Sequence, residues 1–142
     1  MVAIRKCTGA DCEQIFVLLQ QLWPEKTLDL FALGRVYHRA LADLQHLLCT
    51  VANGNVVGFC SLTIKNNLWQ AGYLAHIGEL VISKEKRGLG IGSALLAAII
   101  GVAKQAGCSK VELDSAFHRL EAHKFYQQQG FENRGYLFSK SL

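Results

Sequence analysis

The sequence has almost no proline and no segment with the composition of a linker. Among its 142 residues Pro24 is the single proline, and no stretch is rich in proline or in glycine with serine. Such stretches commonly separate domains, so their absence argues against an internal boundary. Because the length is also typical of one domain, we expect residues 1–142 to form a single domain.

Cysteine is present, but not in a pattern that stabilises a small fold. The count of five is odd, and no two cysteines have C-x-x-C spacing. These facts argue against a disulfide framework and against a zinc ribbon, and no other cluster of metal ligands stands out. We therefore expect no metal, and free thiols in a reducing compartment such as the cytoplasm.

Long apolar runs are absent as well. The longest run is Ala94–Ala103, interrupted by Gly101, whereas crossing a bilayer takes about 20 apolar residues. The N-terminal residues include Arg5 and Lys6, but the apolar segment of a signal peptide does not follow them. The sequence thus predicts no membrane partner and a cytoplasmic location.

Charge of one sign is only slightly in excess. Lysine and arginine number 15 against 11 aspartates and glutamates, which gives a net charge of +4 at pH 7. A strongly basic nucleic-acid-binding surface would need a larger or more clustered excess, so we expect no nucleic-acid partner. The mild excess favours small acidic ligands or phosphates.

Hydrophobic periodicity divides the chain into alternating elements. It predicts strands over Val2–Lys6, Leu47–Ala52, Val56–Ile64, Tyr73–Ser83, Val111–Ser115 and Phe131–Lys140. It predicts helices over Asp11–Trp23, Leu28–Leu44, Gly90–Ala106 and Arg119–Gln129. The pair Asn53-Gly54 is typical of a tight hairpin turn between two strands. Later strands alternate with helices, which implies parallel neighbours. The expected fold class is α/β (α+β), a mixed sheet with helices on both faces.

A glycine-rich loop joins the long strand to the helix that follows it. Its residues are Arg87, Gly88, Leu89, Gly90, Ile91, Gly92 and Ser93. Glycine lets a backbone turn tightly and approach a ligand, and the first amides of a helix attract an anion such as phosphate. The sequence therefore predicts a phosphate-binding loop, with a plain glycine-rich turn as the alternative.

Two other phosphate-binding loops fit less well. A Walker A loop needs lysine after its last glycine, but Gly92 is followed by Ser93. A Rossmann fingerprint needs a third glycine where Ser93 stands, and only 50 residues follow Gly92. That remainder is too short for the other strands of a dinucleotide-binding fold.

Candidate catalytic residues lie in the preceding strand and in the last helix. Glu79 is the only acid inside the apolar strand Tyr73–Ser83, and His76 lies three residues before it. Either could act as a general base, while an ion pair or a surface histidine is the structural alternative. Ideal alternation places the two on opposite faces, and a β-bulge would change that. Tyr126 lies on one helix face with Ala122, Phe125 and Gln129, where it can also simply pack in the core.

Two motifs together resemble the GNAT superfamily of N-acetyltransferases. The loop from Arg87 to Gly92 is similar to the R/Q-x-x-G-x-G/A signature for coenzyme A pyrophosphate, and the segment from Ala122 to Phe131 is similar to A-H-x-F-Y-x-x-x-G-F. The region Ile77 to Phe131 and the order of elements match as well. The resemblance implies a GNAT fold, with a central mixed sheet of six to seven strands flanked by about four helices.

The resemblance also implies roles for individual residues. Acetyl-CoA would be the cosubstrate, bound by the glycine loop and by backbone groups of Leu80, Val81 and Ile82. Tyr126 would be the acid that protonates the departing thiolate, because a phenol (pKa ~10) is a weaker acid than a thiol (pKa ~8.5). Glu79 or His76 would be the base, with a water chain as the alternative. Arg119 stands where many members have an asparagine against the pantetheine arm. Here it would bind a phosphate of the cofactor or simply cap the helix. Relatives often form homodimers through their last strands, so we expect one here.

The acceptor is predicted less sharply than the reaction. The second half resembles small bacterial aminoalkylphosphonate N-acetyltransferases, through Ile77–Val81, Arg87–Leu96 and Phe138–Leu142. The segment Leu22-Trp23-Pro24 resembles aminoglycoside 6′-N-acetyltransferases, although the net charge of +4 is unfavourable for a polycationic acceptor. The sequence thus predicts an N-acetyltransferase for a small primary amine by direct transfer. The alternatives are an aminoglycoside or protein and peptide amine acetyltransferase, or a non-catalytic coenzyme A-binding sensor module.

Overall fold

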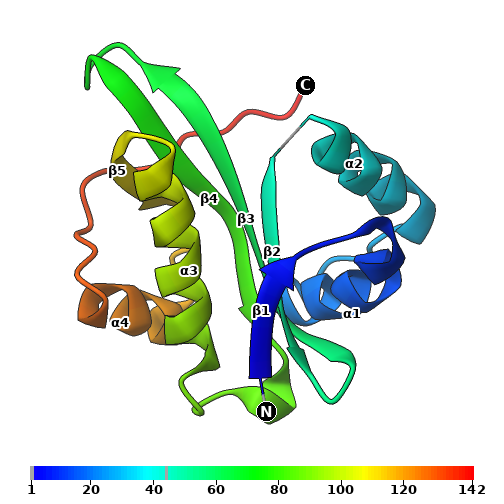
Figure 1. The fold of residues 1–142 in the computed structure, drawn as a ribbon. Helices are drawn as coiled ribbons and strands as arrows, with labels where there is room; N and C mark the ends of the chain where they lie inside the picture. Colours follow the sequence, from blue (N-terminus) through cyan, green and yellow to red (C-terminus); the bar gives the residue numbers. More distant parts are fainter. Residues whose placement is uncertain (1, 44) are drawn as a thin grey trace. The chain divides into compact units, whose positions relative to one another are not determined.

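The sheet of this protein has five strands in the part of the chain that the computed structural model describes, residues 2–43 and 45–142 (Figure 1). They are β1 (Val2–Lys6), β2 (His46–Ala52), β3 (Asn55–Asn67), β4 (Gly72–Ile82) and β5 (Cys108–Leu113). Their spatial order is β1-β2-β3-β4-β5, and the first three neighbouring pairs are antiparallel. The β4–β5 connection runs through a helix, as expected for a mixed sheet.

A tight turn joins β2 to β3 as the sequence predicts. Asn53 and Gly54 both have positive φ angles, of 52° and 78°. Such angles are typical of the two-residue turns whose twist matches that of a hairpin, and asparagine and glycine tolerate them best. Ala52 therefore pairs directly with Asn55 across the turn.

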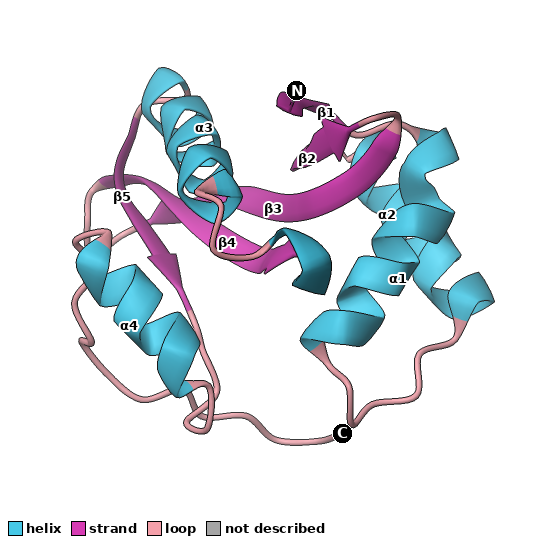
Figure 2. Cartoon of the chain, turned by 90° about the horizontal axis from the view of Figure 1, so that it is seen from below, coloured by secondary structure: helices cyan, strands magenta, loops and turns pink. Residues whose placement is uncertain are grey.

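Three helices cover the sheet within residues 1–112. α1 (Cys12–Leu22) and α2 (Leu30–Ala42) lie on one face, and α3 (Ile91–Gln105) lies on the other (Figure 2). The side chain of Asp29 accepts hydrogen bonds from the first amides of α2 at 2.9 and 3.2 Å, which fixes where that helix begins. The helix was predicted to reach Leu44, which lies outside the described residues.

The core lies between the sheet and each helical layer. On one face, Ile15, Leu18 and Leu19 of α1 pack in the same cluster as Phe59 and Val81 of the sheet. On the other face, α3 buries its apolar stripe against β2, β3 and β4 through Leu95, Leu96 and Ile99. The long strand β4 is thus held from both sides, which gives a rigid support for any site built on it.

The chain divides into two compact units, Met1–Glu112 and Leu113–Leu142, and each is described by itself. The second contains α4 (Leu120–Gln128). Gly130, with φ of 90°, ends this helix: its amide donates to the carbonyl of Gln127 and the amide of Phe131 to that of Tyr126. A glycine in the left-handed conformation commonly ends a helix in this way. That residues 1–142 form one domain stays a prediction.

The strand predicted over Phe131–Lys140 is wrong. Within the described residues this segment has no regular secondary structure, so the sheet has five strands instead of six to seven. Alternating apolar residues form a strand only where a neighbouring strand takes their backbone hydrogen bonds. Here Tyr136, Leu137 and Phe138 are instead 78, 70 and 90% exposed.

No helix in the described residues is long and apolar enough to cross a membrane. The longest apolar helix is α3, which packs on the sheet. Its apolar surface is therefore accounted for by the core.

Candidate active site

A β-bulge interrupts the pairing of β3 with β4. Leu62 pairs with Ile77 and Cys60 pairs with Leu80, so that Ser61 alone faces two residues, Gly78 and Glu79. The extra residue therefore lies on β4. A bulge bends its strand and redirects the side chains that follow it.

The bulge brings the two candidate bases to the same face of the sheet. His76 pairs with Thr63, and the side chain of Glu79 bonds to Ser61. Because Ser61 and Thr63 are two residues apart on one strand, they point to the same side. Ideal alternation would have separated His76 from Glu79, so here the bulged alternative is confirmed.

Glu79 and Ser61 form a reciprocal pair of hydrogen bonds. The Ser61 hydroxyl donates to Oε2 of Glu79, and the backbone amide of Glu79 donates to the Ser61 oxygen at 3.1 Å. Ser61 is only 8% exposed, whereas Glu79 is half-buried. The carboxylate is thus held at the edge of the buried region and is still open to solvent.

His76 belongs to a small charged cluster that spans three strands. Its Nδ1 lies 3.9 Å from Oε1 of Glu112 on β5, and Nζ of Lys65 on β3 lies 3.9 Å from the same oxygen. The acidic partner lies beside the imidazole, so the site contains a second pair of groups able to bind or move a proton. Neither Glu112 nor Lys65 was among the predicted site residues.

The glycine loop presents an open backbone just before α3. Gly88 and Gly90 have φ angles of 77° and 82°, and a Cβ added at either would meet no atom within 4 Å. Gly90 is the N-cap of α3 and carries no side chain that could occupy the first amides. Nε of Arg87 donates to the carbonyl of Ile82 at 3.0 Å, which anchors its exposed guanidinium beside the loop. These residues fit an anionic group such as a pyrophosphate.

The predicted loop residues thus cluster around one helix start. Arg87, Gly88, Leu89 and Gly90 are exposed before α3, while Ile91, Gly92 and Ser93 form its first turn. Gly92 is helical and does not have the positive φ of the other two glycines. The backbone conformation at this position therefore does not require a glycine.

The predicted pantetheine segment is the end of β4. Leu80, Val81 and Ile82 pair with Cys60, Phe59 and Gly58. Val81 is 4% exposed and belongs to the core, so its side chain has a packing role. A contact of these backbone groups with coenzyme A stays a prediction.

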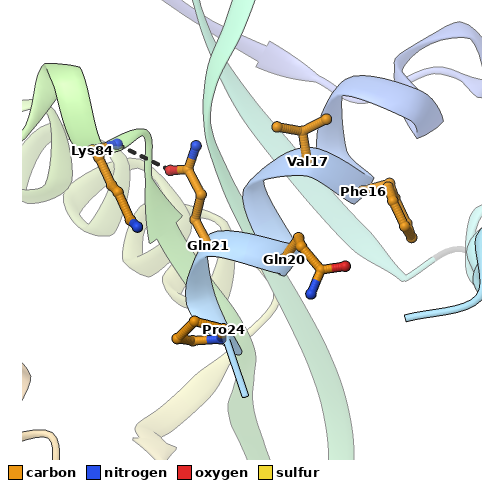
Figure 3. A pocket seen from close by; sticks show the side chains of 6 residues that line it. All are labelled: Phe16, Val17, Gln20, Gln21, Pro24 and Lys84. Carbon is orange, nitrogen blue, oxygen red and sulfur yellow. Dashed lines mark hydrogen bonds between the residues drawn. The ribbon is translucent and has the colours of Figure 1, made fainter. Parts of the chain in front are cut away.

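A hollow of about 360 Å³ lies beside α1 and Lys84, which is three residues before the glycine loop (Figure 3). Four of its lining residues belong to α1: Phe16, Val17, Gln20 and Gln21. The other two are Pro24, just after α1, and Lys84, just after β4. The Lys84 amide donates to the side-chain oxygen of Gln21 at 3.0 Å, drawn as a dashed line in Figure 3. This bond ties the segment between β4 and the glycine loop to α1.

Arg119 and Tyr126 lie in the second unit and are described there. Tyr126 is 9% exposed and makes edge contacts with the rings of Phe125 and Phe131, at 5.5 and 5.7 Å between centroids. Tyr126 therefore packs among aromatic side chains, which is the structural alternative that the sequence leaves open. Arg119 is the N-cap residue of α4, and its side chain does not cap the helix. The predicted roles of both toward acetyl-CoA stay predictions.

One group of potential metal ligands occurs among the described residues. Ligand atoms of Cys7, Asp11 and Cys49 lie within 4.8 Å of one another, and all three residues are buried. However, both oxygens of Asp11 already accept hydrogen bonds from Arg5, at 2.8 and 2.9 Å. The expectation of no metal stays a prediction.

Comparison with known proteins shows the family. Residues 11–131 match the model of the Acetyltransferase (GNAT) family. The chain belongs to the GNAT family. It is 34% identical over 140 residues to aminoalkylphosphonate N-acetyltransferase of Salmonella typhimurium, covering 98% of this chain and 90% of the relative. It is 30% identical to aminoglycoside N(6′)-acetyltransferase type 1 of Stenotrophomonas maltophilia, covering 91% and 85%.

A solved structure is similar along the whole length of the chain. A transcriptional regulator from Bacillus halodurans C-125 superposes with a TM-score of 0.92 at 25% identity, covering 100% of both chains. The GNAT family uses acetyl-CoA, and the curated relatives are named N-acetyltransferases. The protein is therefore an acetyl-CoA-dependent N-acetyltransferase with a GNAT fold.

Sequence reasoning missed four residues that lie around Glu79 and His76: Ser61, Lys65, Gly78 and Glu112. Ser61 carries the one clear signal, because it is the only hydroxyl residue in the apolar stretch Val56–Leu62. Its partner Glu79 is 18 residues away, so the pairing depends on strand register. Glu112 has no comparable local signal.

Proposed function

We propose that this N-acetyltransferase transfers an acetyl group directly from acetyl-CoA to the primary amine of a small molecule. The observation that carries the proposal is the bulged strand β4. It holds Glu79 and His76 on one face and leads within a few residues into the exposed glycine loop. A candidate proton acceptor and a candidate anion-binding loop thus lie on one continuous segment.

The open backbone of the glycine loop supports a cosubstrate site there. Acetyl-CoA, when bound, supplies the acetyl group as a thioester. The loop from Arg87 to Ser93 would hold its pyrophosphate through backbone amides and the Arg87 guanidinium. Backbone groups of Leu80–Ile82 would hold the pantetheine arm and the acetyl oxygen, and Arg119 would add a positive contact.

Proton transfer assigns roles to three side chains. Glu79, acting through a water molecule, would take a proton from the acceptor ammonium, and His76 beside Glu112 is the alternative base. As the carbon–nitrogen bond forms and the carbon–sulfur bond breaks, Tyr126 would donate its phenolic proton to the departing sulfur. The second proton of the nitrogen would leave through water and restore the Tyr126 phenol. Direct transfer is favoured because four of the five cysteines are buried. The fifth, Cys108, is half-buried at the first residue of β5, outside the bulge and the glycine loop.

Two facts favour a small acceptor that carries an acidic group. The relative named for aminoalkylphosphonates matches 98% of the chain. The net charge of +4 suits an anionic acceptor better than the polycationic aminoglycosides for which another relative is named. A cytoplasmic location and a homodimer are part of the same proposal.

The test is release of free thiol from acetyl-CoA in the presence of different amines. The panel contains aminoalkylphosphonates, polyamines, amino acids, aminoglycosides and a basic peptide. We expect turnover with a small acidic amine. Thiol release with the basic peptide alone would contradict the acceptor class, and none with any amine would contradict the proposed function.

Variants then test the assigned roles. Tyr126→Phe and Glu79→Gln should each lower kcat by about 10²- to 10⁴-fold, the usual contribution of general acid–base catalysis, with acetyl-CoA affinity retained. The matched control is Tyr136→Phe, which removes the hydroxyl of a tyrosine that is 78% exposed. Unchanged turnover in Tyr126→Phe would remove Tyr126 from the mechanism.

A further inference from the structure

Ser61 stands out as a polar residue in an apolar part of the sheet. Every residue of β3 from Val56 to Leu62 is buried, and Ser61 carries the only hydroxyl among them. A buried hydroxyl is costly unless it is hydrogen-bonded. Here the hydroxyl both donates and accepts a hydrogen bond, and both partners belong to Glu79 on the next strand.

Both hydrogen bonds of this hydroxyl go to Glu79. A serine hydroxyl has one hydrogen to donate, and that hydrogen is directed at Oε2 of the carboxylate. The same oxygen accepts from the Glu79 amide at 3.1 Å. Ser61 therefore fixes the backbone and the side chain of Glu79 relative to each other.

Gly78 provides the space that this arrangement needs. A Cβ added at Gly78 would lie 2.8 Å from the Ser61 oxygen, which is closer than side-chain atoms normally approach. Gly78 does not have a positive φ, so alanine can adopt its backbone conformation. The glycine is thus needed for room beside Ser61.

We infer that Ser61 is a positioning residue for the catalytic base Glu79. Gly78, which has no side chain, leaves the space that the Ser61 hydroxyl needs for this contact. This inference rests on the proposed function. The Ser61 hydrogen occupies Oε2, whereas no hydrogen bond from the described part of the chain reaches Oε1. Oε1 is therefore the oxygen that receives, through a water molecule, the proton of the acceptor ammonium.

A purely structural role is the competing explanation. The bulge takes the Glu79 amide out of the regular ladder, and the Ser61 oxygen satisfies that amide. A structural role predicts reduced stability and unchanged turnover. A positioning role predicts reduced kcat in folded enzyme, with the KM for acetyl-CoA unchanged.

The first experiment compares Ser61→Ala with Ser61→Thr in the thiol-release assay. Ser61→Ala should lower kcat roughly ten- to a hundredfold, the scale of an error of about 1 Å in a reacting group. Ser61→Thr keeps the hydroxyl and should restore most of the turnover. Thr63→Ala is the matched control, because Thr63 is the next hydroxyl on the same face of β3 and is exposed.

The second experiment tests Gly78 by non-additivity. Gly78→Ala should lower kcat as Ser61→Ala does, because its Cβ displaces the hydroxyl. In the Ser61→Ala background the same substitution should have no further effect, since the obstructed atom is gone. A full additional loss in the double variant would overturn the assignment of Gly78.

The third measurement does not depend on activity. Hydrogen exchange of the Glu79 amide, followed by NMR, should become faster in Ser61→Ala than in wild type. Equal exchange, or Ser61→Ala turning over as fast as wild type, would overturn the inference. A wild type that acetylates no amine would overturn the proposed function instead, and the exchange rates would still test the Ser61–Glu79 contact.

Discussion

Replacing Asp11 with asparagine should destabilise the fold at neutral pH and change its response to acid. The Asp11 carboxylate accepts from Nη1 and Nη2 of Arg5 at 2.8 and 2.9 Å, and from the Thr8 amide at 2.7 Å. It is 5% exposed. One buried carboxylate thus joins β1, the turn that follows it and the start of α1.

The size of the effect follows from the pKa of Asp11. The Arg5 guanidinium, helped by the Thr8 amide and opposed by burial, lowers this pKa from 3.8 to about 2. At 1.36 kcal/mol per pKa unit, the ionised carboxylate contributes about 2 kcal/mol to stability. Because the folded pKa is the lower one, this contribution is present above pH ~4 and is lost as the pH falls toward 2.

Urea unfolding, followed by tryptophan fluorescence at pH 7 and between pH 4 and 2, measures both effects. We expect Asp11→Asn to lower the free energy of unfolding by about 2 kcal/mol at pH 7 and to have a flatter profile in acid. Glu85→Gln is the control, because the pKa of Glu85 is also lowered, by a hydrogen bond from Ser83, but its carboxylate is fully exposed. A variant that loses as much stability between pH 4 and 2 as wild type would refute the reasoning.

Two further predictions concern buried groups. The hydroxyl of Thr50 is fully buried and has no hydrogen-bond partner among the described residues, so Thr50→Val should raise the free energy of unfolding by about 1 kcal/mol, whereas Thr63→Val at an exposed site should not. A lower stability in urea would contradict this. Of the five free cysteines only Cys108 is not buried, so an aromatic disulfide reagent should titrate one thiol quickly in native protein and five after denaturation. Cys108→Ser should abolish the fast phase, and a remaining fast thiol would contradict the assignment.

Long helices and strands with turn residues at their ends were predictable from the sequence. The expected strand over Tyr73–Ser83 is β4 at Gly72–Ile82, and the expected helix over Gly90–Ala106 is α3 at Ile91–Gln105. Both contain extended apolar patterns that end at turn residues. Local periodicity therefore determines them almost to the residue.

Short strands were predicted less well because pairing decides them. The strand expected over Val111–Ser115 is β5 at Cys108–Leu113, directly after Gly107 with its φ of 84°. The segment Phe131–Lys140 has an apolar pattern and no strand. A strand of a few residues is stable only beside a partner, and periodicity carries no information about the partner.

The chemistry of the site was predictable residue by residue, but its contacts were not. Glu79 is identifiable as the single acid in an apolar strand, and the glycine loop by its spacing. The Ser61 contact arises from register alone. Between the pairs Leu62–Ile77 and Cys60–Leu80, one residue of β3 faces two of β4.

The same register explains why a carboxylate is tolerated in β4. Without the extra residue, Glu79 would lie opposite Cys60, whose side chain is fully buried. An unpaired carboxylate there would be strongly unfavourable. The bulge turns Glu79 to the face of Ser61, where it gains a hydrogen-bond donor and access to solvent. The irregularity that sequence periodicity does not predict is therefore what makes Glu79 compatible with the fold and available for proton transfer.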